Sequence, residues 1–258
     1  MGIVNVTPDS FSDGGRYAAA EAAVAHARTL VQQGAAIVDV GGESTRPGAE
    51  PVSEEEELLR TIPVITTIAR NWDGPISIDT LKPAVAREAV LAGATIWNDV
   101  SALGGFGAPE MAAALGCEVI LMHMKGEPRT MQDDPRYDDV LAEVIEFLLE
   151  RAELALGAGV SRDKIMLDPG IGFGKTLEHN LTLLRSLERI GDIGFPMVLG
   201  ASRKRTIQAI DPSAVDAGDR LGGSLALALH AAEKGCAVIR AHDVRETVQA
   251  LKVWERLA

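Results

Sequence analysis

The stretch KIMLDPGIGFGKT, residues 164–176, joins a short apolar run to a glycine-rich continuation. The apolar run has the near-continuous hydrophobicity of a parallel strand covered on both faces, and it ends at Asp168. The continuation is not a phosphate-binding P-loop, because Pro169 stands where that motif needs its first glycine. The dinucleotide pattern G-x-G-x-x-G fails too, because Lys175 stands at its last glycine. The stretch therefore predicts a strand that ends in a carboxylate.

Apolar runs of this kind recur along the whole chain. In sequence order, we expect strands at 2–7, 35–41, 75–80, 94–100, 117–124, 164–170, 196–202 and 237–243. Stretches with apolar residues at helical spacing separate them, for example 20–31, which Gly34 ends, 140–155 and 221–232. Eight strand–helix units without an internal repeat predict an α/β fold, a (β/α)8 TIM barrel formed by a single domain over residues 1–258. A doubly wound open sheet is the alternative on this pattern alone.

The composition limits the kind of partner. With 47% hydrophobic and 24% charged residues, the chain of 258 residues can bury a large core. Its formal net charge of −12 argues against nucleic acid or an anionic membrane as a general partner. Cys117 and Cys236 lie in apolar runs and indicate buried thiols in a reducing compartment. No secretory leader or membrane-spanning run is visible, so we expect a cytoplasmic protein.

Polar residues stand at or near the end of every expected strand, where barrel enzymes hold their active sites. In chain order they are Asn5, Asp39, Asp79, Asn98, His123, Asp168, Ser202 with Lys204, and Arg240 with His242. A single aspartate after a strand is more often a turn residue or helix cap than a ligand, and His123 also fits a core histidine. Capping does not place a suitable group on every strand, so the set predicts a site.

The charges of these residues divide the expected site in two. The acceptors suit a flat heterocycle with adjacent N–H donors and are Asp79, Asn98 and Asp168. The other groups suit an anion, together with a divalent metal ion that takes oxygen ligands, and are Asn5, Lys204, Arg240 and His242. No His/Cys cluster has the spacing of a zinc site, and no Ser-His-Asp order is visible.

Two loops stand out by length and composition. They cover 8–18 and 42–57, and each carries an isolated large side chain, Phe11 in the first and Arg46 in the second. Either they are solvated surface loops, the second running into an acidic helix start at 54–57, or they are lids that complete the site once substrate binds. A large side chain beside an active rim favours the lids.

Eight motifs in a fixed order resemble the dihydropteroate synthase family. They are GIVNVTPDSFSDGG (2–15), IVDVGGESTRPGA (37–49), ISIDTLKP (76–83), WNDVSA (97–102), LMHMKGEPRTMQ (121–132), LDPGIGFGK (167–175), GASRK (200–204) and IRAHDV (239–244). The resemblance runs from Gly2 to the C-terminus. It implies the barrel fold and the condensation of 6-hydroxymethyl-7,8-dihydropterin diphosphate with 4-aminobenzoate, which gives 7,8-dihydropteroate and diphosphate in folate biosynthesis.

The resemblance also implies roles for single residues. Those implied in catalysis are Asp39, Asp79, Lys204, Arg240 and His242. Those implied in pterin binding are Asp79, Asn98, Met122, Asp168, Lys204 and Arg240. Those implied in diphosphate binding are Asn5, Thr45, Arg240 and His242, with Mg2+ as cofactor at Asn5 and with Arg240 and His242 as cations. Those implied in 4-aminobenzoate binding are Phe11, Thr45, Arg46, Pro47, Phe173, Ser202 and Lys204. On this interpretation Lys175 is peripheral.

Two other functions stay open at this point. One is a pterin methyltransferase domain that serves a corrinoid, against which the intact second loop and the GASRK and IRAHDV motifs speak. The other is a paralogue that binds pterin without catalysis, which we expect to have lost loop residues that are present here. The family resemblance further implies small-molecule substrates and a homodimer.

Overall fold

The computed structural model describes residues 1–6, 15–45 and 48–257. Eight parallel strands form its centre, and they are β1 (Gly2–Asn5), β2 (Val38–Gly41), β3 (Ile76–Asp79), β4 (Ile96–Asp99), β5 (Glu118–Met122), β6 (Ile165–Asp168), β7 (Val198–Leu199) and β8 (Val238–Ile239). Strands β1 to β6 pair in chain order, and β7 pairs with β8. Backbone bridges join Leu167 to Met197 and Gly2 to Ala241, so both seams between the two sheets are closed. The result is a (β/α)8 barrel, and the open-sheet alternative is wrong.

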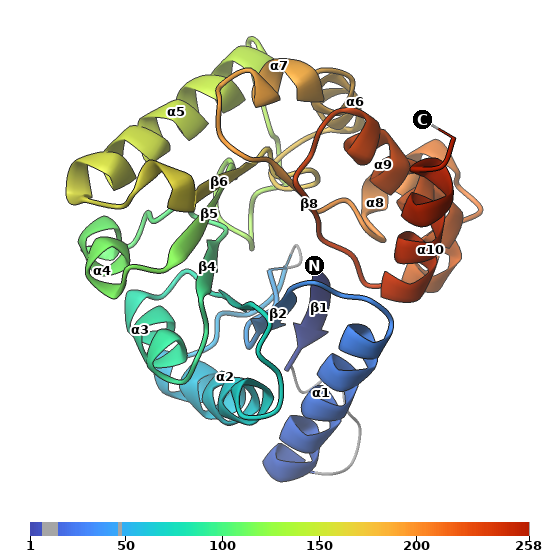
Figure 1. The fold of residues 1–258 in the computed structure, drawn as a ribbon. Helices are drawn as coiled ribbons and strands as arrows, with labels where there is room; N and C mark the ends of the chain where they lie inside the picture. Colours follow the sequence, from blue (N-terminus) through green and yellow to red (C-terminus); the bar gives the residue numbers. More distant parts are fainter. Residues whose placement is uncertain (7–14, 46–47, 258) are drawn as a thin grey trace.

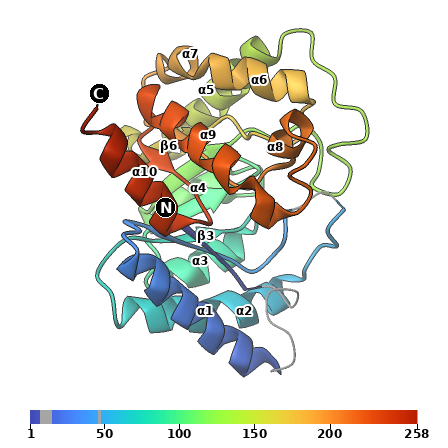
Figure 2. The same cartoon turned by 90° about the vertical axis from the view of Figure 1, so that its right-hand side faces the viewer.

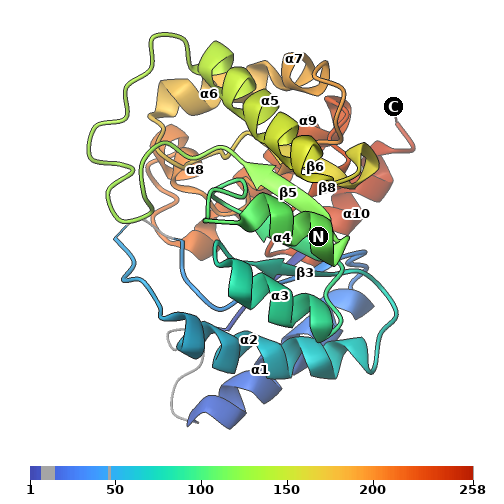
Figure 3. The same cartoon turned by 90° about the vertical axis from the view of Figure 1, so that its left-hand side faces the viewer.

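Helices surround the strands on the outside, as Figure 1 shows along the barrel axis. They are α1 (Gly15–Gln32), α2 (Glu54–Ala69), α3 (Pro83–Leu91), α4 (Ala108–Leu115), α5 (Val140–Ala158), α6 (Leu177–Arg185), α7 (Leu187–Gly191), α8 (Arg205–Ile210), α9 (Leu221–Glu233) and α10 (Val244–Trp254), with short 3-10 turns at Arg162–Lys164 and Ala217–Arg220. Helices α1 and α2 pack side by side, as do α9 and α10 on another side of the barrel (Figures 2 and 3). Among the described residues, no helix is both long and apolar enough to cross a membrane.

The helix α5 follows the predicted apolar stripe. The residues of that stripe are all buried, and they are Val140, Val144, Leu148, Ala152 and Ala155. The Asp139 side chain begins the helix by accepting hydrogen bonds from the amides of Leu141 and Ala142. Gly159, at a φ of 105°, ends it in the left-handed conformation that glycine adopts at low cost.

The eight strands were predicted in the right order, but every one is shorter than predicted. The end of β6 shows why. The Asp168 carboxylate accepts a hydrogen bond of 2.7 Å from the amide of Gly170, and Gly170 has a φ of 67°, so the chain turns immediately after Asp168. The predicted continuation through Gly170 belongs to this turn. Apolar residues in such turns extend the hydrophobic run beyond the paired backbone.

The alternation of side chains along the strands divides the core in two. Outward residues such as Trp97 and Leu121 belong to the main core between strands and helices. A separate cluster lies on the inner face and consists of Ile96, Ile120, Met166 and Val198, with Met1, Ile37 and Val238 packed against it. The inner positions one step further along these strands lie above this apolar floor. Those positions are where the expected site residues stand.

Candidate active site

Strand alternation brings the expected residues to one place, the mouth of the barrel above the apolar floor. Counting two residues on from the floor positions gives Asp39, Asn98, Met122, Asp168 and Arg240. The same parity gives Asn5 from β1 and Asp79 from β3. These side chains therefore point inward at or near the C-terminal ends of the strands, Asp39 two residues before the end of β2, and we call this region the rim.

One arginine joins two of the rim carboxylates. The Arg240 Nε lies 2.6 Å from Asp39 Oδ2, and its Nη2 lies 2.7 Å from Asp79 Oδ2. The Asn98 amide also donates to Asp39 Oδ2, at 3.4 Å. Asp39 is fully buried, and its Oδ1 has no hydrogen-bond partner among the described residues. A buried carboxylate oxygen without a donor is costly, so this atom marks a place for a further polar group.

Burial governs the electrostatics of this network. It raises the pKa of Asp79, although Arg240 opposes the shift, because a buried carboxylate loses its hydration. Burial lowers the pKa of Arg240, but Asp39 and Asp79 outweigh that effect and raise it overall. Arg240 therefore stays charged, and it shares its charge between two acids that compete for it.

Asp168 stands beside this network without an arginine of its own. Burial raises its pKa, while the Gly170 amide and the cations of Lys204 and Arg240 pull the pKa down. A side chain at Gly200, directly after β7, would come within 3.6 Å of Asp168 Oδ2 and 3.8 Å of Arg240 Cδ. The glycine therefore leaves open space between the carboxylate and the guanidinium.

Ser202 and His242 form a pair after the ends of β7 and β8. The Ser202 Oγ accepts from the His242 amide at 3.2 Å and lies 3.1 Å from the imidazole Nδ1. Because that hydroxyl still has its proton to donate, Nδ1 is assigned as the acceptor and Nε2 as the protonated nitrogen. Burial and the neighbouring Arg240 lower the pKa of His242 to about 3. In the free protein the imidazole is therefore a neutral donor, whereas the cationic His242 expected beside a bound diphosphate stays a prediction.

Phe173 and Lys204 meet at the rim. The Lys204 Nζ lies 3.9 Å from the centre of the Phe173 ring, which suits a cation–π contact. Phe173 also packs in a small apolar cluster with Met122, Val100 and Met131. The structure thus brings the predicted neighbours Met122, Phe173 and Lys204 together.

The family resemblance implied a peripheral Lys175, but the side chain is buried, with 3% of its surface exposed. Its Nζ contacts His123 Nδ1 at 2.9 Å and donates to the carbonyls of Gly170 at 3.0 Å and Phe173 at 2.9 Å. The pKa of His123 is lowered to about 3: burial is the largest cause, and the charge of the neighbouring Lys175 is the next. The imidazole is therefore neutral. His123 thus serves Lys175 as an acceptor, and the interpretation of a satisfied core histidine is the one that holds.

The remaining predicted residues have looser surroundings. Asn5 ends β1 and is half-buried, and Thr45 is half-buried in the loop after β2. Neither side chain makes a hydrogen bond to another of the described residues, so the structure does not join them to the network. Phe11, Arg46 and Pro47 lie outside the described residues.

Asn5 can hold a magnesium ion only if the substrate and water supply most of the other ligands. Within the described part of the chain, no three His, Cys, Asp or Glu side chains gather as a metal cage. Asn5 offers a hard carboxamide oxygen at the rim, and Mg2+ commonly takes one protein ligand beside substrate phosphates and water. The residues fit an ion that arrives with an anionic substrate.

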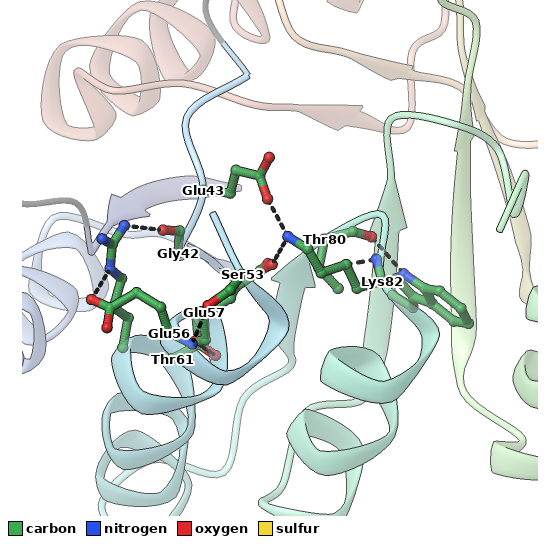
Figure 4. Close-up of polar contacts among 10 residues, drawn as sticks. Gly42, Glu43, Ser53, Glu56, Glu57, Thr61, Thr80 and Lys82 are labelled. Atoms are coloured by element: carbon green, nitrogen blue, oxygen red, sulfur yellow. Dashed lines mark hydrogen bonds and ion pairs between the residues drawn. The ribbon is translucent and has the colours of Figure 1, made fainter. Parts of the chain in front are cut away.

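Sequence reasoning missed the residues that hold the second loop. Lys82 lies between Glu43 and the buried Glu57, and Arg60 donates to the Gly42 carbonyl at 2.8 Å (Figure 4). The acidic run at 54–57 had been interpreted only as a helix start. A lysine three residues after Asp79 was the available signal, but nothing in the sequence shows which acid it contacts.

Comparison with known proteins agrees with this geometry. The family model described as "Pterin binding enzyme" matches residues 1–242. The chain belongs to this family of pterin-binding enzymes. Within it, the chain is 51% identical over 256 residues to dihydropteroate synthase of Escherichia coli (strain K12), covering 99% of this chain and 90% of that one. It is 48% identical over 263 residues to dihydropteroate synthase of Neisseria meningitidis serogroup B (strain MC58), covering 100% and 92%.

Among solved structures, the chain is likewise similar to dihydropteroate synthases. Xanthomonas albilineans dihydropteroate synthase with 4-aminobenzoic acid matches with a TM-score of 0.94 and 49% identity, covering 100% of this chain and 92% of that one. The same organism's enzyme in complex with 7,8-dihydropteroate matches with a TM-score of 0.90 and 46% identity, with the same coverage. At this likeness the relatives' barrel and this one are the same fold.

Proposed function

We propose that this protein is a dihydropteroate synthase. It condenses 6-hydroxymethyl-7,8-dihydropterin diphosphate with 4-aminobenzoate and releases 7,8-dihydropteroate and diphosphate. The observation that carries the proposal is the inward ring of acids around Arg240 at the mouth of the barrel. The relatives support it, since one has been solved with 4-aminobenzoic acid and another with 7,8-dihydropteroate.

The buried acids suit the pterin. Its 2-amino-4-oxo pyrimidine edge presents adjacent N–H donors, and the proposed acceptors are Asp79, Asn98 and Asp168. The free protein leaves these acids short of donors, so ring N–H groups would lower the pKa values that burial raises. Met122 and Arg240 would line the faces of the ring.

Arg240 and His242 suit the diphosphate. Arg240 supplies fixed positive charge, and the His242 imidazole supplies its Nε2–H as a hydrogen-bond donor. We propose that Asn5 would hold a magnesium ion that binds together with the diphosphate, and that Thr45 contributes to the diphosphate site. When bound, the ion supplies positive charge that stabilises the leaving group. The protein's part is to place Arg240 where negative charge grows on the departing oxygen.

The 4-aminobenzoate would bind towards Phe173, Ser202 and Lys204. The Phe173 ring offers an apolar wall to the arene, and the Lys204 ammonium at its face offers a partner for the carboxylate. Thr45 contributes from the second loop. Phe11, Arg46 and Pro47 are proposed for the same region on the family resemblance alone.

The chemistry is a displacement at the exocyclic methylene carbon of the pterin. The bond between that carbon and a diphosphate oxygen breaks, the arylamine nitrogen forms a new bond to the carbon, and the nitrogen then loses a proton. Because an arylamine is a weak nucleophile, the bond to diphosphate breaks ahead of the attack by the arylamine nitrogen. Positive charge then spreads into the dihydropterin, and the carboxylates of Asp79 and Asp168 stabilise it, with Asp39 setting the position of Arg240.

This electrostatic part of the mechanism has its own test. Replacing both Asp79 and Asp168 by asparagine keeps acceptors for the pterin but removes two negative charges. We expect the single-turnover rate to fall about a hundredfold or more, because charge stabilisation in a buried site is worth several kcal/mol. Pterin binding, measured by calorimetry, separates the two effects. A variant that binds the pterin more weakly yet turns it over at the wild-type rate contradicts the mechanism.

The function itself is tested by diphosphate release from the purified protein. The reaction contains magnesium, the dihydropterin diphosphate and 4-aminobenzoate, and the control omits the arylamine. Release that depends on the arylamine supports the synthase. Pterin binding without such release identifies the non-catalytic paralogue instead, and methyl transfer to a corrinoid identifies the methyltransferase.

We also infer from the family resemblance that the chain folds as one domain, forms a homodimer and works in the cytoplasm. The apolar run at 224–235, most of which lies in α9, is one candidate for the dimer contact. Sedimentation of the purified protein tests the dimer, because a monomer at micromolar concentration contradicts it.

A further inference from the structure

At its first residue, Gly42, the loop after β2 packs closely against α2. Gly42 packs so tightly that a side chain there would come within 2.7 Å of the Thr61 methyl group and 3.0 Å of Glu57 Cγ. Its carbonyl accepts a hydrogen bond of 2.8 Å from Arg60, which Glu56 holds at 3.0 Å on the same helix. The backbone at Gly42 is therefore fixed against the first turns of α2.

The next residue is held by a different strand. Lys82 follows β3 and reaches both Glu43 in the loop and Glu57 in α2, the latter at 2.5 Å (Figure 4). Glu57 is fully buried, whereas the side chains of Lys82 and Glu43 are 18% and 15% exposed. The three side chains, which we call the Lys82 clamp, tie the loop after β2 to the loop after β3.

The electrostatics of the clamp favour Lys82 as its centre. Burial lowers the pKa of Lys82, but hydrogen bonds with Glu43 and Glu57 outweigh it and raise the pKa. Burial raises the pKa of Glu57, and Lys82 opposes that shift. A hydrogen bond with Thr80 also lowers the pKa of Glu57, while Glu57 Oε1 has no partner among the described residues. The two carboxylates thus share the Lys82 ammonium. Because the buried Glu57 holds Lys82 in place, Lys82 can in turn hold Glu43.

The position of the clamp connects the two halves of the proposed site. Lys82 comes three residues after Asp79, which belongs to the proposed pterin pocket. Glu43 comes two residues before Thr45, which belongs to the proposed arylamine region. We propose that Lys82 and Glu43 are positioning residues for 4-aminobenzoate, because their contact sets the path of the second loop relative to the pterin pocket. This inference rests on the proposed function.

The sharpest test is Glu43→Ala, because it releases the loop but leaves the buried pair of Lys82 and Glu57 intact. Initial rates are measured while each substrate is varied in turn. We expect KM for 4-aminobenzoate to rise about tenfold, since a small displacement of positioning groups is costly. KM for the pterin diphosphate stays within about twofold, because the clamp lies outside the pterin pocket. Glu43→Gln keeps an acceptor for Lys82 and recovers most of the loss.

Two comparisons keep the test specific. Glu55→Ala removes the same charge from an exposed position of α2 and should leave both KM values unchanged. Lys82→Met should reproduce the KM change and also lower Tm, because Glu57 then stays buried without its cation. A wild type without arylamine-dependent turnover overturns the proposed function and this inference with it. An active wild type whose Glu43→Ala variant shows unchanged KM values, or an equal rise in both, overturns the inference alone.

Discussion

The Lys175 amino group lies inside the turn after β6, surrounded by acceptors from two loops. It contacts His123 Nδ1 and the carbonyls of His123, Gly170 and Phe173 at 2.9 to 3.3 Å. Burial lowers the pKa of Lys175 to about 7, and these acceptors take up the N–H groups of a side chain that is only 3% exposed. Lys175 stands where a P-loop would have its phosphate-binding lysine, but here it holds the backbone that places Phe173 at the rim.

Replacing this lysine tests that role. Lys175→Met keeps the length of the side chain but leaves buried carbonyls without a donor, so we expect unfolding free energy to fall by about 3 kcal/mol. Urea denaturation measures the change. The matched control is Lys164→Met, whose lysine also donates to a carbonyl, that of Gly116, but at an exposed position where water can replace it. Equal losses in the two variants contradict a special role for Lys175.

His242 gives a pH dependence of known sign. Its pKa in the folded protein is lowered to about 3, whereas the unfolded residue titrates near 6.5. Between these values the unfolded state binds more protons, so acidification through this range removes stability, by up to about 1.4 kcal/mol per pH unit. His242→Gln should flatten the stability curve between pH 6.5 and 4. Parallel curves for wild type and variant would show that His242 is not held neutral.

At the scale of elements, the turn 170–174 depends on its glycines for space. Gly170 has a φ of 67°, and a side chain there would come within 1.9 Å of the His123 carbonyl. Gly174 has a φ of 61° and would meet the Lys125 carbonyl at 2.3 Å. The Tyr137 hydroxyl also donates to the Gly174 carbonyl at 2.8 Å. The loop after β5 and the turn after β6 are therefore packed backbone against backbone.

A glycine pair separates this close packing from the general effect of adding a methyl group. Gly170→Ala should lower the free energy of unfolding by more than about 3 kcal/mol, because the backbone strain and the clash both require the chain to move. Gly157→Ala, in the helix α5 with nothing within 4 Å, should raise it by about 0.5 to 1 kcal/mol. Thermal and urea denaturation measure both. A tolerated Gly170→Ala contradicts the packing described for the turn.

At the scale of the whole molecule, the sequence predicted what depends on periodicity. Eight apolar runs gave the strands and their order, and the parity of the strands carries Asp39, Asp79 and Asp168 inward. Contacts between distant segments did not follow from the pattern. Nothing in the sequence shows that Lys175 reaches His123 or that Lys82 reaches Glu57, because side-chain pairing depends on how loops fold back. The neutral state of His242 likewise depends on burial that only the assembled barrel creates.

The most direct measurement is the stoichiometry of the two products in one quenched reaction. The wild-type protein is given magnesium, the dihydropterin diphosphate and 4-aminobenzoate, and diphosphate and 7,8-dihydropteroate are quantified together. Condensation at the rim predicts equal amounts of both in the complete reaction, and no dihydropteroate when the arylamine is left out. Diphosphate without dihydropteroate, or bound pterin without either product, would contradict the assignment of this barrel as a dihydropteroate synthase.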